Sequence, residues 1–219
     1  MPRCDSSLTP WTENVAACQL GWRAAVSRLE RLIAVVAAHE AVRVDDSGRP
    51  EAAVALLLLA DPDRLLLIRR ADRVGDPWSG QLALPGGRRE TVDDNLLATA
   101  IRETREETGL VLESAWHVAT LDDHAPRTTS LPPILVRPFV FRLKSEQQPS
   151  LSDEVAHARW VELDFLARPG VFRRTPILVG GAELTVHGYH LPEGLLWGMT
   201  ERIVTPILQR WKGLRRDDV

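Results

Sequence analysis

The clearest apolar pattern in the chain is the almost continuous apolar run at residues 51–60. A run of this length is typical of a strand that is buried on both faces. Asp61-Pro62-Asp63 has the composition of a turn, so Arg64–Arg70 is predicted to return as the hairpin partner of the first strand. Further strands are predicted over residues 116–121, 134–143 and 155–161, and in a hairpin of 176–179 with 183–189 around Gly180-Gly181.

Helical spacing of apolar residues appears at both ends of the chain. Helical spacing over residues 20–42 predicts an N-terminal helix with one apolar side, which comprises Leu20, Ala24, Val26, Leu29, Leu32, Ile33, Val36 and His39. This helix is expected to pack on the main domain or on a second subunit, which would make a homodimer. A short helix is predicted at 162–167 and a closing amphipathic helix at 195–211, with loops at 45–50, 70–87, 122–133 and 144–152.

Composition narrows the class of protein. The 219 residues are 44% hydrophobic and 26% charged, which fits a soluble globular chain with one domain and an appendage. We divide it into an N-terminal arm and helix (1–47), a main domain (48–213) and a polar tail (214–219). The predicted class is mixed α/β, because several strands alternate with a few helices.

Charge and cysteine content exclude several partners. The net charge of −3 gives no basic footprint for nucleic acid or an anionic membrane, and the apolar run at 51–60 is too short to span a bilayer. Cys4 and Cys18 do not make a disulfide framework. No secretory signal pattern opens the chain. The expected compartment is therefore a reducing cytoplasm, and neither nucleic acid nor a membrane is expected as a partner.

One more helix is predicted over residues 93–110, with the sequence DDNLLATAIRETREETGL. Asp93 or Asp94 can cap its N-terminus, because a short carboxylate accepts the free N–H groups of the first turn. Gly109 stands where a left-handed C-cap residue is needed. A core-facing stripe recurs at helical spacing and comprises Leu97, Ala100, Ile101, Thr104 and Thr108.

The other face of this helix carries a cluster of acids. Glu103, Glu106 and Glu107 stand at i, i+3 and i+4, so their carboxylates are expected to point the same way and to repel one another. A divalent cation would explain the cluster, since hard cations such as Mg²⁺ prefer oxygen ligands. The alternative is a solvated face in which Arg102 and Arg105 pair with the acids.

The segment upstream of the helix favours the metal site. Leu84-Pro85-Gly86-Gly87 precedes a short spacer, an acidic residue and the helix itself. This arrangement resembles the Nudix box, which is a Gly, five residues, a Glu, seven residues and then R-E-U-x-E-E-x-G-U, with U a bulky apolar residue. The matching residues are Arg102, Glu103, Glu106, Glu107, Gly109 and Leu110.

The box departs from the family pattern at two places. Thr104 stands where the family prefers an aliphatic residue. Counting seven residues back from Arg102 puts Asp94 at the Glu position, and the spacer from Gly87 is then one residue longer than the pattern. The resemblance implies an α/β/α sandwich with a mixed central sheet, and a hydrolase that uses Mg²⁺ or Mn²⁺ to cleave a diphosphate.

The resemblance also implies roles for individual residues. Glu103, Glu106 and Glu107 would bind the metal, with the backbone of Gly86 or Gly87 as a further ligand; Glu103 is alternatively the general base. Arg102 would hold the acids in place by charge-assisted bonds. Glu154, on a later loop, is the candidate for an additional ligand or base, and its alternative is an ordinary surface residue.

The upstream loop LLLIRRADRV…SGQLALPGG resembles the signature of the coenzyme A pyrophosphatase branch of the family, with matches at Arg70, Arg73, Gly80, Pro85, Gly86 and Gly87. The late segment GLLWGMT, residues 194–200, resembles the branch's segment that opens the final helix. The branch implies coenzyme A or an acyl derivative as substrate, with Gly86 and Gly87 at the phosphates. Five arginines could meet its 3′-phosphate and diphosphate, or could serve only solubility and salt bridging: Arg69, Arg70, Arg73, Arg88 and Arg89. The alternatives are ADP-ribose, a nucleotide sugar or a damaged nucleoside triphosphate, and a non-catalytic ligand sensor.

Overall fold

The computed structural model describes residues 26–44, 48–76, 78–126, 133–179 and 181–214. Within these residues a central sheet of seven strands has the order β3-β2-β1-β6-β5, with β4 also paired to β1 and β7 also paired to β2. β1 and β6 run parallel and the other pairs are antiparallel, so the sheet is mixed. The strands are β1 (Glu51–Leu59), β2 (Arg64–Arg70), β3 (Leu82–Ala83), β4 (Gly86–Arg88), β5 (His117–Thr120), β6 (Leu135–Arg142) and β7 (Val155–Glu162).

Five of these strands lie where the apolar pattern predicted them, to within one residue at each end. β3 and β4 are different, because they lie in the segment that was predicted to be a loop. They contain only two and three residues. Their pairing with β2 and β1 makes them strands, and a partner distant in sequence leaves no periodic signal.

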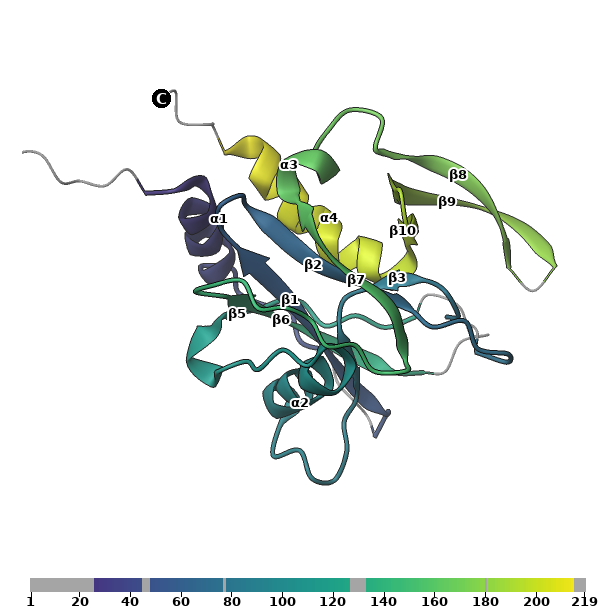
Figure 1. Ribbon diagram of the computed structural model, residues 1–219, viewed down its shortest axis with the longest axis horizontal. Helices are drawn as coiled ribbons and strands as arrows, with labels where there is room; N and C mark the ends of the chain where they lie inside the picture. Colours follow the sequence, from purple (N-terminus) through teal and green to yellow (C-terminus); the bar gives the residue numbers. More distant parts are fainter. Residues whose placement is uncertain (1–25, 45–47, 77, 127–132, 180, 215–219) are drawn as a thin grey trace, which may run out of the picture.

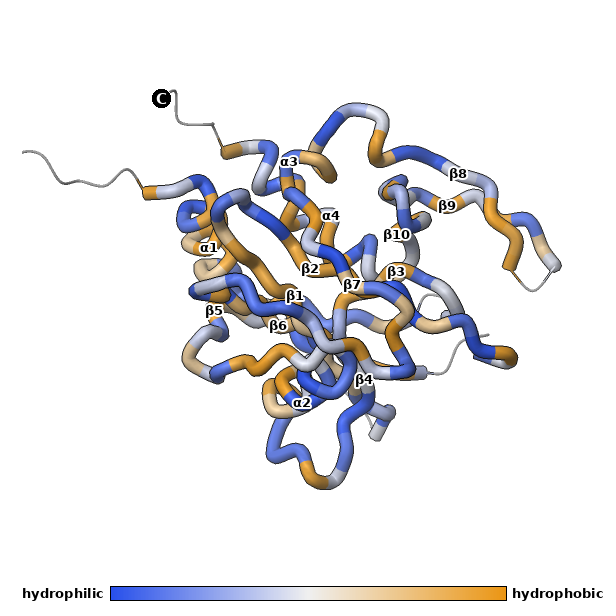
Figure 2. The backbone as a smooth tube through the Cα atoms, in the orientation of Figure 1, coloured by the Kyte–Doolittle hydropathy of each residue, from blue (hydrophilic) through white to orange (hydrophobic). Residues whose placement is uncertain are grey.

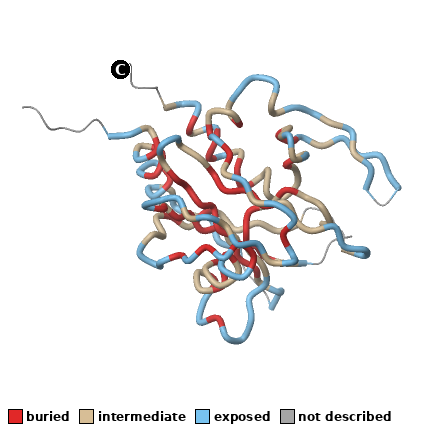
Figure 3. The backbone as a smooth tube through the Cα atoms, viewed as in Figure 1, coloured by how far each residue is buried: buried red, intermediate tan, exposed pale blue. Residues whose placement is uncertain are grey.

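Helices cover both faces of the central sheet (Figure 1). The side chains of β1 are divided between the two faces of the sheet. Leu56 and Leu58 belong to the core under α1 (Arg28–Ala37) and α4 (Gly198–Gly213). Leu57 and Leu59 belong to the core under α2 (Leu96–Thr108). Alternate side chains of a strand point to opposite faces. The apolar centre is visible in Figure 2 and is buried in Figure 3. The predicted α/β/α sandwich with a mixed sheet is confirmed.

The N-terminal helix α1 is shorter than the predicted span of 20–42. Residues 20–25 lie outside the described residues. The side chain of Ser27 accepts the N–H of Glu30 and caps the helix, which ends at Ala37. After the helix, two acids of the loop that follows β5 bind the backbone: Asp122 accepts the N–H of Val42 at 2.8 Å and Asp123 accepts the N–H of Val44 at 3.1 Å. Of the two partners predicted for α1, it packs on the domain, where Arg28 lies over the Trp211 ring of α4.

The helix that carries the acids, α2, also begins later than predicted. Its N-cap is Asn95, whose side chain accepts the N–H of Ala98, so the prediction of Asp93 or Asp94 as the cap is wrong. Gly109 adopts the left-handed conformation at φ 69° and ends the helix, as predicted. Thr104 and Thr108 are fully buried, and each hydroxyl donates to a carbonyl one turn back in the helix, so neither is left without a hydrogen bond.

A second sheet of three described strands projects from the body, in the order β10-β9-β8 (Figure 1). Its strands are β8 (Phe172–Val179), β9 (Ala182–Leu191) and β10 (Gly194–Trp197). The predicted hairpin is therefore longer than expected, and Gly180 lies outside the described residues. Residues 195–197, which were predicted to be helical, pair with β9 instead, so α4 begins at Gly198.

The short helix α3 (Leu163–Leu166) lies within the predicted span 162–167. None of the helices in the described ranges is long and apolar enough to cross a membrane.

Candidate active site

The acids of α2 do not all share one environment. Glu107 is only 4% exposed and points into the protein, whereas the side chain of Glu106 is 58% exposed. Glu103 lies between these extremes, with 16% of its side chain exposed. The expectation that all three carboxylates point the same way therefore fails for Glu107, because position 107 of the helix faces β4 and the core.

The turn Gly86-Gly87 is built against these acids. The N–H of Gly86 donates to the Glu107 carboxylate at 2.9 Å. A Cβ on Gly87 would lie 2.4 Å from Cδ of Glu103, and a Cβ on Gly86 would lie 2.2 Å from the carbonyl oxygen of Ala53. Both distances are far below van der Waals contact, so only glycine allows β1, β4 and α2 to approach this closely.

Arg102 connects the acids to one another. Its Nη1 donates to Glu103 at 3.0 Å and to Glu106 at 2.9 Å, and its Nη2 donates to the carbonyl of Arg88 at 3.0 Å. The predicted contacts between Arg102 and the acids of the box are thus present. The surrounding carboxylates raise the pKa of the guanidinium, so Arg102 is permanently charged.

A fourth acid, Asp93, completes this arrangement and was predicted only as a cap. Its two carboxylate oxygens accept Nε and Nη2 of Arg102, each at 2.9 Å. Asp93 is buried and also accepts the N–H of Glu90 and the hydroxyl of Thr99. The bonds to Arg102 hold the pKa of Asp93 well below its ordinary value, despite the opposing effect of burial.

The position of Asp93 corrects the alignment of the box. Asp94 was placed at the Glu position by counting back from Arg102, but Asp94 is exposed and Asp93 makes the contacts. Asp93 follows Gly87 after five residues, which is the family spacing. The extra residue therefore lies between Asp93 and Arg102. Counting forward from Gly87 would have found it.

The electrostatics of the site favour bound positive charge. Burial raises the pKa of Glu107 to about 7, and the nearby charge of Glu103 adds to the effect. Burial also raises the pKa of Glu103, against the lowering effect of Arg102. Two carboxylates that are hard to ionise side by side become easier to ionise when a cation lies between them.

The upstream loop brings two of the predicted arginines to the same end of the sheet. Arg70 donates to Asp76 at 2.9 Å, and its positive charge lowers the pKa of Glu107. Arg73 donates to Glu154 at 3.1 Å. The charge of Glu154 raises the pKa of both Glu103 and Glu107, so Glu154 acts on the same acids. The structure therefore brings Glu154 and the box together.

Arg88 is the exposed arginine that follows the glycine turn. Its carbonyl accepts from Arg102, and among the described residues its guanidinium has no hydrogen bond or ion pair. The adjacent Arg89, by contrast, pairs with Glu51 at 2.9 Å. Arg88 is thus available to an incoming anion.

The residues present fit a hard divalent cation by their chemistry. Glu103, Glu107 and the backbone of the glycine turn supply only oxygen ligands, as Mg²⁺ and Mn²⁺ prefer. In the described part of the chain no three acidic, His or Cys side chains already converge as a metal site. Here Arg102 is hydrogen-bonded to Glu103 and Glu106. Glu106 is exposed and can rotate toward a cation at little cost.

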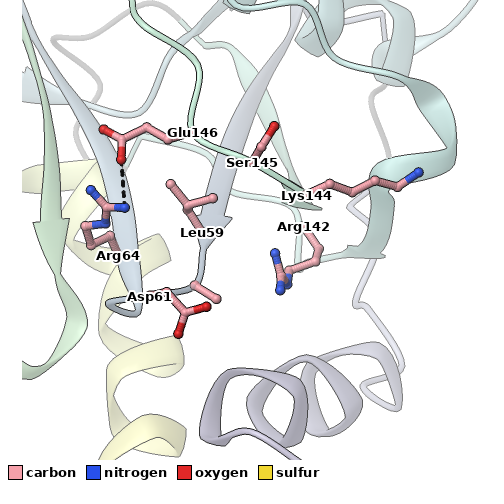
Figure 4. Close-up of a pocket in the computed structure, with 8 residues that line it drawn as sticks. Leu59, Asp61, Arg64, Arg142, Lys144, Ser145 and Glu146 are labelled. Carbon is pink, nitrogen blue, oxygen red and sulfur yellow. Dashed lines mark ion pairs between the residues drawn. The ribbon is translucent and has the colours of Figure 1, made fainter.

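A pocket of about 250 Å³ lies at the opposite end of β1 and contains none of the predicted site residues (Figure 4). It is lined by the ends of β1 and β6 and by the ion pair of Arg64 with Glu146 at 2.9 Å. The candidate active site is therefore assigned from the acids of α2 and the glycine turn.

Similarity to known proteins shows the family of this chain. The NUDIX domain model matches residues 49–178, so the chain belongs to the Nudix family of diphosphate hydrolases. The protein is similar to a Nudix hydrolase named NudL from Photorhabdus laumondii, with 30% identity, covering 77% of this chain and 88% of the relative. It is 33% identical to the peroxisomal coenzyme A diphosphatase NUDT7 of Mus musculus, covering 57% of this chain and 54% of the mouse protein.

An uncharacterised protein of Schizosaccharomyces pombe is 41% identical over 48% of this chain, but the match spans only 33% of that protein. Among solved structures, a MutT/nudix family protein from Enterococcus faecalis superposes with a TM-score of 0.53 and 20% identity, covering 84% of this chain and 70% of that one. This likeness shows the shared fold.

Proposed function

We propose that this Nudix hydrolase cleaves the diphosphate of coenzyme A or acyl-coenzyme A, giving 3′,5′-ADP and a 4′-phosphopantetheine. Water adds to one phosphorus of the P–O–P bridge, and the other phosphate leaves with the bridging oxygen. The observation that carries the proposal is the packing of Glu103 and Glu107 against the Gly86-Gly87 turn.

The proposal includes Mg²⁺ or Mn²⁺ as the cofactor. A bound divalent cation would neutralise the diphosphate and acidify the attacking water. Glu103 and Glu107 would hold it, with Glu106 and the backbone of Gly87 as further ligands. Arg102 and Asp93 would keep Glu103 in place through the contacts described above.

The remaining residues would act on the substrate directly. The backbone of Gly86 and Gly87 would contact phosphate oxygens of the substrate. Arg88 would contact the diphosphate, since its guanidinium is exposed and has no partner among the described residues. Arg70 and Arg73 would contact other phosphates of the substrate. Glu154 would be the general base or an additional metal ligand.

Coenzyme A is favoured over other diphosphates by the loop that contains Arg70 and Arg73 and by the similarity to the mouse coenzyme A diphosphatase. The same catalytic residues would also serve hydrolysis of ADP-ribose, a nucleotide sugar or a damaged nucleoside triphosphate. Burial raises the pKa of the Glu107 carboxyl, and a bound cation would stabilise its charged form. A protein that only binds a ligand has no need of such a carboxylate, which argues against a non-catalytic sensor.

A substrate panel tests the proposal. Purified protein with Mg²⁺ or Mn²⁺ is incubated with coenzyme A, acetyl-coenzyme A, ADP-ribose, a nucleotide sugar and an oxidised nucleoside triphosphate. We expect 3′,5′-ADP from the first two at the highest kcat/KM. Hydrolysis of ADP-ribose without hydrolysis of coenzyme A would overturn the substrate, and nucleotide binding without any turnover would support the sensor.

A further inference from the structure

The loops that contain Arg73 and Glu154 are fixed to each other by their backbones. The N–H of Ala71 donates to the carbonyl of Glu154 at 2.8 Å, just beyond the last pairing of β2 with β7. The N–H of Arg73 donates to the hydroxyl of Ser79 at 2.8 Å, which holds the backbone of the arginine in a compact turn. The two side chains are therefore neighbours because of the fold, and each can move without its backbone.

The contact between the two side chains is easily broken. Nη1 of Arg73 lies 3.1 Å from Glu154, and Nη2 lies 3.5 Å from Asp153. The exposed fractions of the Arg73 and Glu154 side chains are 43% and 51%, so water and salt screen the pair. An anion of higher charge, such as a phosphate, would compete successfully for the same guanidinium.

The carboxylate of Glu154 also has a second possible interaction, with a cation bound at the acids of α2. The N–H of Ser152 donates to the carbonyl of Glu107 at 3.1 Å, so the loop that carries Glu154 is packed against the part of α2 that would hold a cation. While Arg73 neutralises Glu154, the attraction between Glu154 and such a cation is weakened. Removing the arginine from Glu154 would strengthen that attraction.

We infer that Arg73 exchanges partners during binding, from Glu154 in the substrate-free protein to a phosphate of the substrate in the complex. The exchange frees Glu154 to turn toward the metal-binding acids only when substrate is present. Arg73 is then both a substrate contact and a positioning residue for Glu154. This inference rests on the proposed function, since it needs a phosphate-bearing substrate and a bound cation.

Titration of Mn²⁺ into substrate-free protein tests the exchange, because it isolates the effect of Arg73 on Glu154 from substrate contact. In the Arg73→Ala protein we expect Mn²⁺ to bind about two- to fivefold more tightly than in the wild type, the range that loss of one exposed ion pair allows. The gain should vanish in the double variant Arg73→Ala/Glu154→Gln, which should bind Mn²⁺ like Glu154→Gln alone. The KM for coenzyme A should rise about tenfold in Arg73→Ala, through the lost charge-assisted bond.

Arg69→Ala is the matched control for loss of one positive charge. Arg69 lies in β2, just before the same loop, and pairs with Asp72 rather than with Glu154. Its loss should therefore leave Mn²⁺ affinity unchanged. Equal Mn²⁺ affinity in wild type and Arg73→Ala would overturn the exchange, as would a gain that persists in the double variant. If instead the wild type neither binds Mn²⁺ nor hydrolyses a diphosphate, the proposed function itself fails.

Discussion

Asp93 and Arg102 form a bidentate ion pair, with both carboxylate oxygens 2.9 Å from guanidinium nitrogens. The pair connects the loop before α2 to the middle of the helix. Because Arg102 also binds Glu103, the position of an acid in the candidate site depends on a residue outside the helix. The eight residues between Asp93 and Arg102 are one more than the family pattern has, and we interpret the extra residue as what lets the shorter Asp side chain reach the guanidinium.

Loss of this pair should destabilise the protein. In Asp93→Ala, Arg102 and the N–H of Glu90 lose a buried acceptor, so we expect the free energy of unfolding to fall by about 2–4 kcal/mol. Urea denaturation measures the change. Asp94→Ala is the control, because Asp94 is exposed and its replacement should change stability by less than about 0.5 kcal/mol. Equal losses in the two variants would contradict the corrected alignment.

The ion pair of Asp93 with Arg102 also predicts how the stability of the protein varies with pH. The pKa of Asp93 is lowered on folding from an ordinary value of 3.8, so the unfolded chain takes up its proton first as the pH falls. The stabilisation from Asp93 is thus fully present above about pH 5 and decreases as the pH falls toward the folded-state value. We expect the difference in unfolding free energy between wild type and Asp93→Asn to shrink between pH 5 and pH 3. A difference that is independent of pH would contradict this.

The contribution of Glu107 to stability should depend on pH in the opposite direction from that of Asp93. Its pKa is raised from 4.5 to about 7, so ionisation of this buried carboxyl destabilises the metal-free protein as the pH rises through that interval. Glu107→Gln keeps an acceptor for the N–H of Gly86 and removes the charge. At pH 8 without metal, we expect the variant to be more stable by about 1–3 kcal/mol, at 1.36 kcal/mol per pKa unit, with no gain at pH 4.

The activity of Glu107→Gln should fall although its stability rises. Without the Glu107 carboxylate a cation is held poorly, so we expect turnover with Mg²⁺ to fall by about 100-fold or more. The steady-state rate on coenzyme A measures this, alongside the stability of the same preparation. Wild-type turnover in Glu107→Gln would remove Glu107 from the metal site, whereas loss of both turnover and stability would point to misfolding.

The glycine turn gives a steric prediction. In Gly87→Ala the new Cβ would meet the carboxylate of Glu103 at about 2.5 Å, so Glu103 must move and activity should drop at least tenfold. Gly213→Ala is the control, because a Cβ there has no neighbour within 4 Å. Equal activity of the two variants would mean that Glu103 is not needed in its present position.

Local signals in the sequence predicted most of the fold. The apolar run of β1 and the return of β2 needed only neighbouring residues, and Gly109 marked the end of α2 from its conformational freedom. β4 could not be found in this way, because its strand character comes from pairing with β1.

The sequence predicted which residue types form the candidate site, but not how their side chains are arranged and buried. Spacing identified the acids of α2, and by helical geometry alone Glu103, Glu106 and Glu107 would look alike. What separates them is the position of β4, which buries Glu107 and leaves Glu106 in solvent. Asp93 was misread because it precedes a helix in the way a cap does. The five-residue spacing from Gly87 marks it in the sequence, and the structure shows its contact with Arg102.

The central claim is that the acids of α2 bind a divalent cation beside the Gly86-Gly87 turn. Crystals soaked with Mn²⁺ and 3′,5′-ADP test it most directly through anomalous diffraction. We predict a peak about 2.0–2.6 Å from carboxylate oxygens of Glu103 and Glu107, with Glu106 turned away from Arg102. Absence of such a peak at saturating Mn²⁺, with Arg102 still bound to Glu103 and Glu106, would contradict the account.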